Sequence, residues 1–226
     1  MKIAILDCVA PNALVDKHGP AGGAVANWLQ PHLPEAEMTH IDLHARDTLP
    51  SPGDFDGYVI TGSEMGVYDE TLWMRPLRDF LAALRETRRP VFGICFGHQI
   101  MADVWGGQAE KVERGFILGA RRYDLGSVQI TAHVAHQDQV TRVPPGAEVI
   151  ASAPYCPVGG LAYDFPALSV QFHPEYWEGF ISDIIDMDGE DLMSPKAIEA
   201  AKGSLSGEVA TDLYGPEAAA FFRAHV

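Results

Sequence analysis

One cysteine stands where its sulfur could act as a nucleophile. Cys95 follows a short apolar run, residues 90–94, that predicts a buried strand, and residues 98–104 behind it have the pattern of a helix. At a sharp strand-to-helix turn the sulfur can be exposed, and the free N–H groups and positive dipole end of the helix favour a thiolate. Gly93 and Gly97 flank the cysteine, as a tight elbow requires. The pattern predicts a nucleophile elbow with sulfur in place of the serine oxygen.

A base for this nucleophile follows much later in the chain. A second apolar strand, residues 168–172, ends at His173, and Glu175 lies two residues further on. A cysteine nucleophile works best beside an imidazole, and the imidazole works best when a carboxylate fixes its tautomer. Pro174 stiffens the link between the two side chains. Cys95 and His173 are 78 residues apart (173 − 95), so the fold must bring them together.

Each of these residues also has a purely structural interpretation. Buried cysteines most often only fill space, and a histidine at a strand end is commonly a hydrogen-bonded surface group. A carboxylate two residues after a histidine is common by chance. The presence of both His173 and Glu175 favours the catalytic interpretation of Cys95. Cys8 and Cys156 have no comparable neighbourhood, and we interpret both as structural.

Two motifs in this order resemble the signatures of the class I, or triad, glutamine amidotransferases. They are Gly93-Ile-Cys-Phe-Gly-His-Gln99 and Gln171-Phe-His-Pro-Glu175. The resemblance is greatest to stand-alone proteins similar to the glutaminase domain of GMP synthase, and by motif it covers residues 3–175. It implies a flavodoxin-like core, a triad of Cys95, His173 and Glu175, and glutamine as the substrate.

The resemblance also implies donors for the oxyanion that forms during acyl transfer. Residues 59–68 leave a strand as a glycine-containing loop at the carboxyl edge of the sheet, where ligands bind in such folds. The implied donors are the backbone N–H of Ser63 (or Gly62) and that of Phe96. Ser63 and Glu64 stand where the family usually has a second glycine and a proline, but this removes no backbone N–H. A plain β-turn is the alternative interpretation of the loop.

Three further residues are implied in binding glutamine. Gln99 lies one helical turn beyond the cysteine on the same face, and the alternative is an ordinary surface glutamine. Residues 135–140 resemble a family segment that lines the glutamine pocket. His136 and Asp138 match that segment, whereas Ala135 stands where the family often has serine.

A metal site is the other interpretation of this segment. His133, His136 and Asp138 could together approach an ion, but the spacing supplies no third strong ligand. We therefore expect no metal, and the thiol chemistry requires no cofactor.

Composition limits the class of protein. The net charge is −15, and no basic run exists beyond residues 85–89, so we expect no nucleic-acid partner. With 47% hydrophobic residues the chain can bury a full core, but no segment approaches the ~20 apolar residues of a membrane span. Residues 1–7 have the pattern of a strand and not of a signal peptide. Three cysteines without zinc-like spacing suit a reducing compartment, and we expect a cytoplasmic location.

The order of elements predicts an α/β fold. Near-continuous apolar strands separated by helices favour a mostly parallel sheet covered on both faces. The expected strands and helices of this part are residues 2–6, 21–33 (helix), 38–43, 58–60, 71–87 (helix) and 90–94. Short strands separated by turn signals predict a mixed or antiparallel extension of the sheet: residues 118–123, 128–130, 149–152 and 161–163. We predict a single domain over residues 1–226 with a helical tail from about residue 178.

These residues combine into one expected reaction. The Cys95 thiolate attacks the side-chain amide carbon of glutamine, and His173 accepts the thiol proton and passes it to departing ammonia. Glu175 orients His173, and water releases glutamate from a γ-glutamyl thioester. Because no P-loop or second domain is visible, we expect the ammonia acceptor to be a separate synthetase subunit.

Two other functions remain open at this point. A free-standing γ-glutamyl hydrolase or peptidase would use the same thioester chemistry on a different γ-glutamyl compound. A binding module without catalysis is disfavoured because Cys95, His173 and Glu175 are all present. Fold alone does not decide between these functions.

Overall fold

A nine-stranded sheet forms the centre of the computed structural model, which describes residues 1–45, 49–69, 71–207, 209 and 214–226. Its first five strands are parallel neighbours, in the order β2-β1-β3-β4-β11. They are β2 (Glu37–Asp42), β1 (Lys2–Asp7), β3 (Gly57–Ile60), β4 (Val91–Ile94) and β11 (Ala167–Val170). Apolar side chains bury β3 and β4 completely, as expected for central strands of a parallel sheet.

The sheet continues as an antiparallel extension, in the order β10-β9-β6-β7. These strands are β10 (Cys156–Tyr163), β9 (Ala147–Ala153), β6 (Ile117–Leu125) and β7 (Val128–His136). A separate two-stranded antiparallel sheet pairs β5 (Gln108–Lys111) with β8 (Asp138–Arg142). The predicted fold class, a mostly parallel sheet with a mixed extension, is confirmed.

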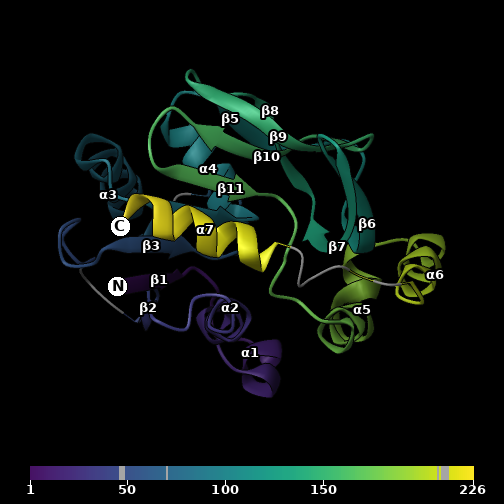
Figure 1. The fold of residues 1–226 in the computed structure, drawn as a ribbon. Coiled ribbons are helices and arrows are strands. Elements are labelled where there is room, and N and C mark those ends of the chain that lie inside the picture. The colour runs from purple at the N-terminus through teal and green to yellow at the C-terminus, as the bar shows by residue number, and fades with distance from the viewer. Residues whose placement is uncertain (46–48, 70, 208, 210–213) are drawn as a thin grey trace.

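Helices cover both faces of the parallel strands (Figure 1). On one face, α2 (Ala21–Leu29) and α7 (Gly215–His225) bury residues such as Trp28 and Phe222 against the sheet. On the other face, α3 (Met74–Thr87) and α4 (Phe96–Val104) form the second hydrophobic cluster. The site at the start of α4 is therefore fixed from both sides by packed core.

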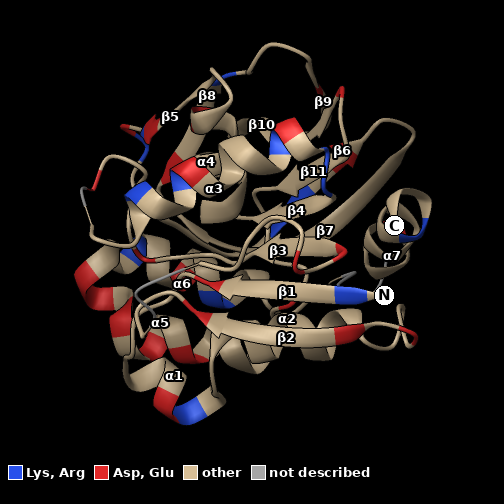
Figure 2. Ribbon diagram, turned by 90° about the vertical axis from the view of Figure 1, so that its left-hand side faces the viewer, with Lys and Arg blue, Asp and Glu red and all other residues tan. Residues whose placement is uncertain are grey.

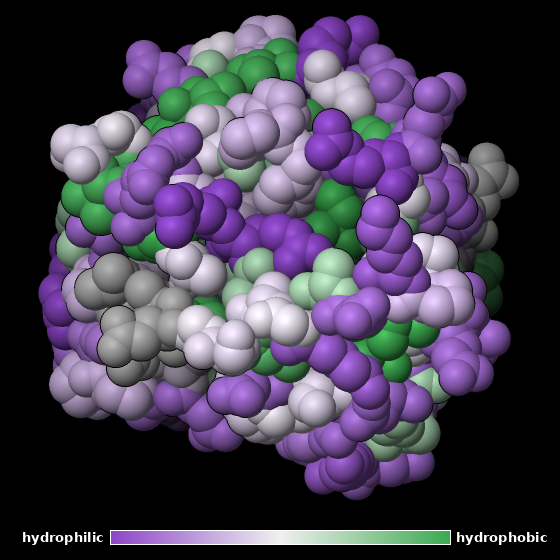
Figure 3. Space-filling view, turned by 90° about the vertical axis from the view of Figure 1, so that its right-hand side faces the viewer, coloured by the Kyte–Doolittle hydropathy of each residue, from purple (hydrophilic) through white to green (hydrophobic). Residues whose placement is uncertain are grey.

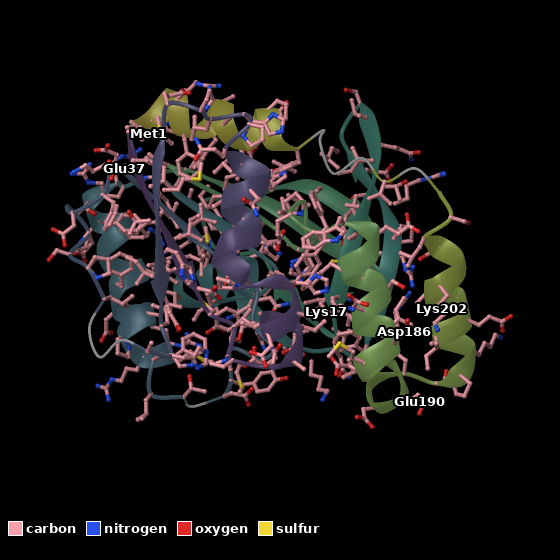
Figure 4. The ribbon with its side chains drawn as sticks, turned by 90° about the horizontal axis from the view of Figure 1, so that it is seen from below. Met1, Lys17, Glu37, Asp186, Glu190 and Lys202 are labelled. Atoms are coloured by element: carbon pink, nitrogen blue, oxygen red, sulfur yellow. The ribbon has the colours of Figure 1, made fainter. Side chains whose placement is uncertain are left out.

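A third layer lies over the antiparallel strands. There α5 (Glu178–Leu192) and α6 (Pro195–Ser204) bury Ile181 and Ile184 against Leu118 of β6. The short helix α1 (Ala13–His18) packs on α5, and Lys17 Nζ lies 2.8 Å from Asp183 Oδ2. Figure 4 shows Lys17 where α1 meets α5, and Lys202 of α6 beside Asp186 of α5.

Acidic residues account for much of the outer surface of this layer. Figure 2 shows Asp and Glu gathered on α5, whereas α1 carries Asp16 next to Lys17. The molecular face that includes α5 and α6 is largely hydrophilic, with hydrophobic residues in small separate patches (Figure 3). Along the described ranges, no helix is long and apolar enough to cross a membrane.

Several element boundaries differ from the sequence-based expectations. Helix α2 ends at Leu29 instead of residue 33 because Pro31 and Pro34 cannot continue it. Helix α4 begins at Phe96, directly after Cys95, so the turn is sharper than expected. Helix α1 was not expected; its N-cap Asn12 accepts hydrogen bonds from the N–H groups of Leu14 and Val15.

The strands of the extension are longer than the strands predicted from the sequence. β7 reaches from Val128 to His136 because it pairs with β6 over nine residues, and such long-range pairing leaves little trace in local composition. β5 and β8 were not expected at all. Helix α6 begins after Ser194, whose hydroxyl caps it by accepting a hydrogen bond from the N–H of Ala197.

Candidate active site

The elbow at Cys95 has a strained backbone. Cys95 has φ 52° and ψ −101° between β4 and α4, a conformation that L-residues avoid at a cost of about 1–3 kcal/mol. Its N–H donates to the Val170 carbonyl of β11 at 2.8 Å, and the N–H of Gly97 donates to the Thr61 carbonyl at 3.1 Å. Cys95 is only 5% exposed and lies in a cavity wall, so its sulfur is less exposed than expected.

The flanking glycines are required for space and not for unusual dihedral angles. Neither Gly93 nor Gly97 has a positive φ. A Cβ atom at Gly93 would collide with the sulfur of Met101, and one at Gly97 would collide with the carbonyl oxygen of Ile60. The elbow is tight because α4 starts directly against β3 and β4.

His173 and Glu175 form a buried pair beside Cys95. The imidazole Nδ1 donates to Glu175 Oε1 at 2.7 Å, and both side chains are 2% exposed. The N–H of His173 donates to the carbonyl of His133 in β7 at 2.8 Å, which fixes the backbone beyond β11. A Cβ atom placed on Gly62 would lie 2.9 Å from His173 Cε1 and 3.7 Å from Cys95 Cβ, so both side chains pack against this residue.

The surroundings of His173 hold its imidazole protonated. Burial disfavours the charge, but the negative charges of Glu175 and then of Cys95 outweigh it, together with hydrogen bonds from His173 to both, and raise the pKa of His173 to about 10. At neutral pH the site therefore favours an imidazolium beside Cys95, which is the charge state that supports a thiolate nucleophile.

This raised pKa has a testable consequence for the pH profile. Because the pKa of His173 is raised from its ordinary value of 6.5 to about 10, the imidazolium persists up to about pH 10. Its contribution to the stability of the folded protein is therefore full below pH 6.5 and is lost as pH rises through about 10. If His173 protonates the leaving group, kcat/KM falls with a basic limb near pH 10. In Glu175→Gln, which removes the largest favourable charge, this limb should move to lower pH. Measuring kcat/KM from neutral pH to about pH 11 tests this; an unmoved limb in the variant would contradict it.

Gln171 is a site residue to which the sequence analysis gave no role. Its side chain is fully buried, and its Nε2 donates to Cys95 Sγ at 3.5 Å. Gln99 Nε2 donates to Gln171 Oε1 at 3.1 Å and to the Asp138 carbonyl at 2.8 Å. This chain of amides fixes the orientation of Gln171 toward the sulfur. The position of Gln171 in the second motif was the available signal.

The loop after β3 contains two of the three expected oxyanion donors, Gly62 and Ser63, and it lies beside Cys95. Gly62 packs against Cys95 and His173, and Ser63 lines the same cavity as Cys95. Within the described ranges, neither the N–H of Ser63 nor that of Phe96 donates to a protein acceptor. Glu64, at the usual proline position, accepts from the N–H of Ala10 and ties the loop to the chain after β1.

The cavity has a volume of about 640 Å³, and its wall includes Gln99, His136 and Asp138 together with Cys95 and His173. The Nδ1 atom of His136 is 3.1 Å from the Asp138 carbonyl oxygen and must therefore donate to it, which leaves Nε2 as an acceptor. Burial lowers the pKa of His136 to about 3, so this imidazole is neutral. Its Nε2 is buried and has no partner among the residues described.

Asp138 lies where a charged head group could bind. It faces Lys111 across the β5–β8 pair, and burial raises its pKa. Tyr68 hydrogen-bonds the same carboxylate, and burial with this bond raises the pKa of Tyr68 to about 12. The part of the chain that the structure describes contains no group of three or more His, Cys, Asp or Glu side chains able to hold a metal ion.

Comparison with known proteins decides the family. Residues 34–180, which include Cys95, His173 and Glu175, match the family described as glutamine amidotransferase class-I. The chain belongs to this family. Both the two sequence motifs and the fold described above agree with membership of this family.

Relatives that match this chain include proteins named as gamma-glutamyl peptidases and proteins named as GMP synthases. The chain is 29% identical to gamma-glutamyl peptidase 3 of Arabidopsis thaliana over 67% of each chain. It is 35% identical to the GMP synthase [glutamine-hydrolyzing] of Aromatoleum aromaticum over 53% of this chain, but only 25% of that protein. A crystal structure of a glutamine amido transferase from Methylobacillus flagellatus has the same fold, with a TM-score of 0.78 at 18% identity, covering 99% of this chain and 94% of that one.

Proposed function

We propose that this chain hydrolyses γ-glutamyl amides through a thioester on Cys95. The observation that carries this proposal is the assembled arrangement at the elbow: Cys95 beside an imidazole whose Nδ1 is held by Glu175 at 2.7 Å. This pairing matches what a cysteine nucleophile needs, namely a base and a group that orients the base. It lies in the wall of a cavity large enough for a small-molecule ligand.

The reaction proceeds in two stages. The Cys95 thiolate attacks the γ-carbonyl carbon, and collapse of the tetrahedral intermediate breaks the C–N bond while His173 gives its proton to the departing amine. Water then adds to the γ-glutamyl thioester with His173 as the base, the C–S bond breaks, and glutamate leaves with Cys95 restored. Glu175 keeps the imidazole in the required tautomer through both stages.

This proposal also assigns donors for the oxyanion and residues that bind the head group of the substrate. The N–H groups of Ser63 (or Gly62) and Phe96 stabilise the oxyanion. Gln99, His136 and Asp138 line the part of the cavity that takes the α-amino and α-carboxyl groups of the substrate. The neutral His136 offers a hydrogen-bond acceptor there, and Asp138 offers a carboxylate next to Lys111.

A free-standing hydrolase of γ-glutamyl compounds is the version of this function that the geometry supports best. The Cys95–His173–Glu175 contacts exist within one chain, and the cavity extends well beyond the sulfur to α1 and α5. Free glutamine would occupy only a small part of such a space. The likeness to the plant gamma-glutamyl peptidase supports the same version.

A glutaminase subunit that delivers ammonia to a separate synthetase is the second candidate. It is favoured by the likeness to the GMP synthase and by the loop at residues 62–68, where Ser63 and Glu64 replace the usual residues. In this version the free chain would turn glutamine over slowly, because the N–H groups of the loop are not yet placed to donate hydrogen bonds to the oxyanion. Binding the synthetase would then raise kcat, since an oxyanion donor acts in the transition state.

The kcat of the purified chain distinguishes these versions. We expect a free-standing hydrolase to reach about 1–10³ s⁻¹ on a γ-glutamyl amide or peptide without any addition. A synthetase subunit should instead gain roughly 10²–10³-fold on glutamine when cell extract lacking this protein is added, which is the effect of one oxyanion donor. Amine and ammonia release should both be measured. Activation by extract on glutamine, with no turnover of γ-glutamyl peptides, would rule out the first version.

A further inference from the structure

The cavity that contains Cys95 has two chemically different ends. One end is polar and includes Lys111, Asp138 and the loop side chains Glu64 and Asp69. The other end lies between α1 and α5, where His18, Asp188 and Asp191 line the cavity together with a group of apolar side chains. We call this apolar group the apolar end; its residues are Leu14, Phe116, Tyr176, Trp177, Phe180 and Ile184. These apolar side chains offer no charge to a zwitterionic α-amino acid head, so they suit a different part of the ligand.

The apolar end begins at the catalytic histidine. The ring of Tyr176 stacks on His173, with centroids 3.9 Å apart and planes at 3°. Phe180 then contacts Tyr176 at 4.4 Å and Trp177 at 5.3 Å between ring centroids. The aromatic row therefore leads away from the reacting atoms on the side of His173.

The direction of the reaction assigns an occupant to this row. His173 gives its proton to the departing amine, so the nitrogen of the scissile bond must lie on the His173 side of Cys95. Whatever is bonded to that nitrogen extends onward from His173. In glutamine only hydrogen atoms are bonded there, and the apolar end would stay empty.

We propose that the apolar end is a subsite for the amine part of the substrate, and that this part carries an aromatic or large aliphatic group. The inference rests on the proposed function and names its substrate class. Trp177 is 44% exposed at this end and Leu192 is 41% exposed, although both are large apolar side chains next to a cavity. A bound apolar group would cover such surface and gain the corresponding hydrophobic free energy.

Two amides that differ only at the far end of the amine test this subsite. The probes are γ-glutamylethylamide and γ-glutamylphenethylamide, whose leaving groups are both basic primary alkylamines, so that a large difference in rate reports on the phenyl group. Burying a phenyl group in an apolar pocket should favour the phenethylamide by roughly 10–100-fold in kcat/KM. The two substrates are compared on the full chain, with amine release as the readout.

Substitutions in the row should lower this preference. In Trp177→Ala and Phe180→Leu the ratio of the two kcat/KM values should fall several-fold, because the phenyl group loses contacts that the ethyl group does not make. Met187→Ala is the matched control, because Met187 is 42% exposed on the same helix and does not line the cavity. Its ratio should be unchanged. Thermal unfolding of each variant identifies any loss of folding.

The outcomes separate the inference from the function on which it rests. Turnover of both amides with a ratio near one would overturn the subsite and leave the hydrolase function intact. A strong preference for the phenethylamide that survives both Trp177→Ala and Phe180→Leu would also overturn it. If no γ-glutamyl amide is hydrolysed and none forms a thioester, the proposed function fails and the inference fails with it.

Discussion

Replacement of Cys95 by alanine is expected to abolish hydrolysis of every γ-glutamyl substrate, with a loss on the order of 10⁴–10⁶ in kcat. The reason is that in the proposed mechanism the Cys95 thiolate forms the covalent intermediate, and Gln171 and His173 are both arranged around this sulfur. The variant should also lose covalent labelling by a glutamine-like electrophile. Mass spectrometry of the intact protein and of its peptides measures this labelling directly.

The two remaining cysteines supply the controls for this result. Burial raises the pKa of Cys8 well above its usual value and raises that of Cys156 to about 12, so both stay as unreactive thiols. Cys8→Ala and Cys156→Ala should therefore keep both activity and labelling, apart from effects of the small cavity that each change leaves. Stoichiometric labelling at Cys8 or Cys156 in the unmodified protein would show that Cys95 is not the nucleophile.

Replacement of His173 by alanine is expected to have an effect of similar size. The change removes the group that carries the proton in both stages of the proposed reaction, and also the positive charge beside Cys95, so electrophile labelling should slow together with turnover. Glu175→Gln alone should cost less, because the imidazole remains. The double variant should lose far less than the product of the two separate losses, since the residues act as a unit.

Steady-state and single-turnover rates on one γ-glutamyl amide test this coupling. His225→Ala serves as the control, because His225 is exposed in the last turn of α7 and does not line the cavity. Its kcat should be unchanged. A His173→Ala variant with near-normal turnover, or losses that multiply independently in the double variant, would be incompatible with a Cys95–His173–Glu175 triad.

The fold was largely predictable because its central elements are marked by local patterns. Apolar runs of four to six residues, interrupted by amphipathic stretches, indicated a parallel sheet with helices on both faces, and the structure confirms this class. Local sequence patterns did not predict the elements that depend on pairing with a distant strand. Strands β5 and β8 are short and polar, and each is stable only because it pairs with the other across an intervening segment of the chain.

The residues able to carry the chemistry could be recognised from local sequence features. A cysteine at a strand-to-helix turn and a His-Pro-Glu segment after a second strand are local features, because backbone geometry at a strand end is set by neighbouring residues. How these groups are surrounded depends on tertiary packing. The amide chain from Gln99 through Gln171 to the sulfur joins segments as far as 76 residues apart. Such contacts follow from the pairing of β11 beside β4, and no local pattern records them.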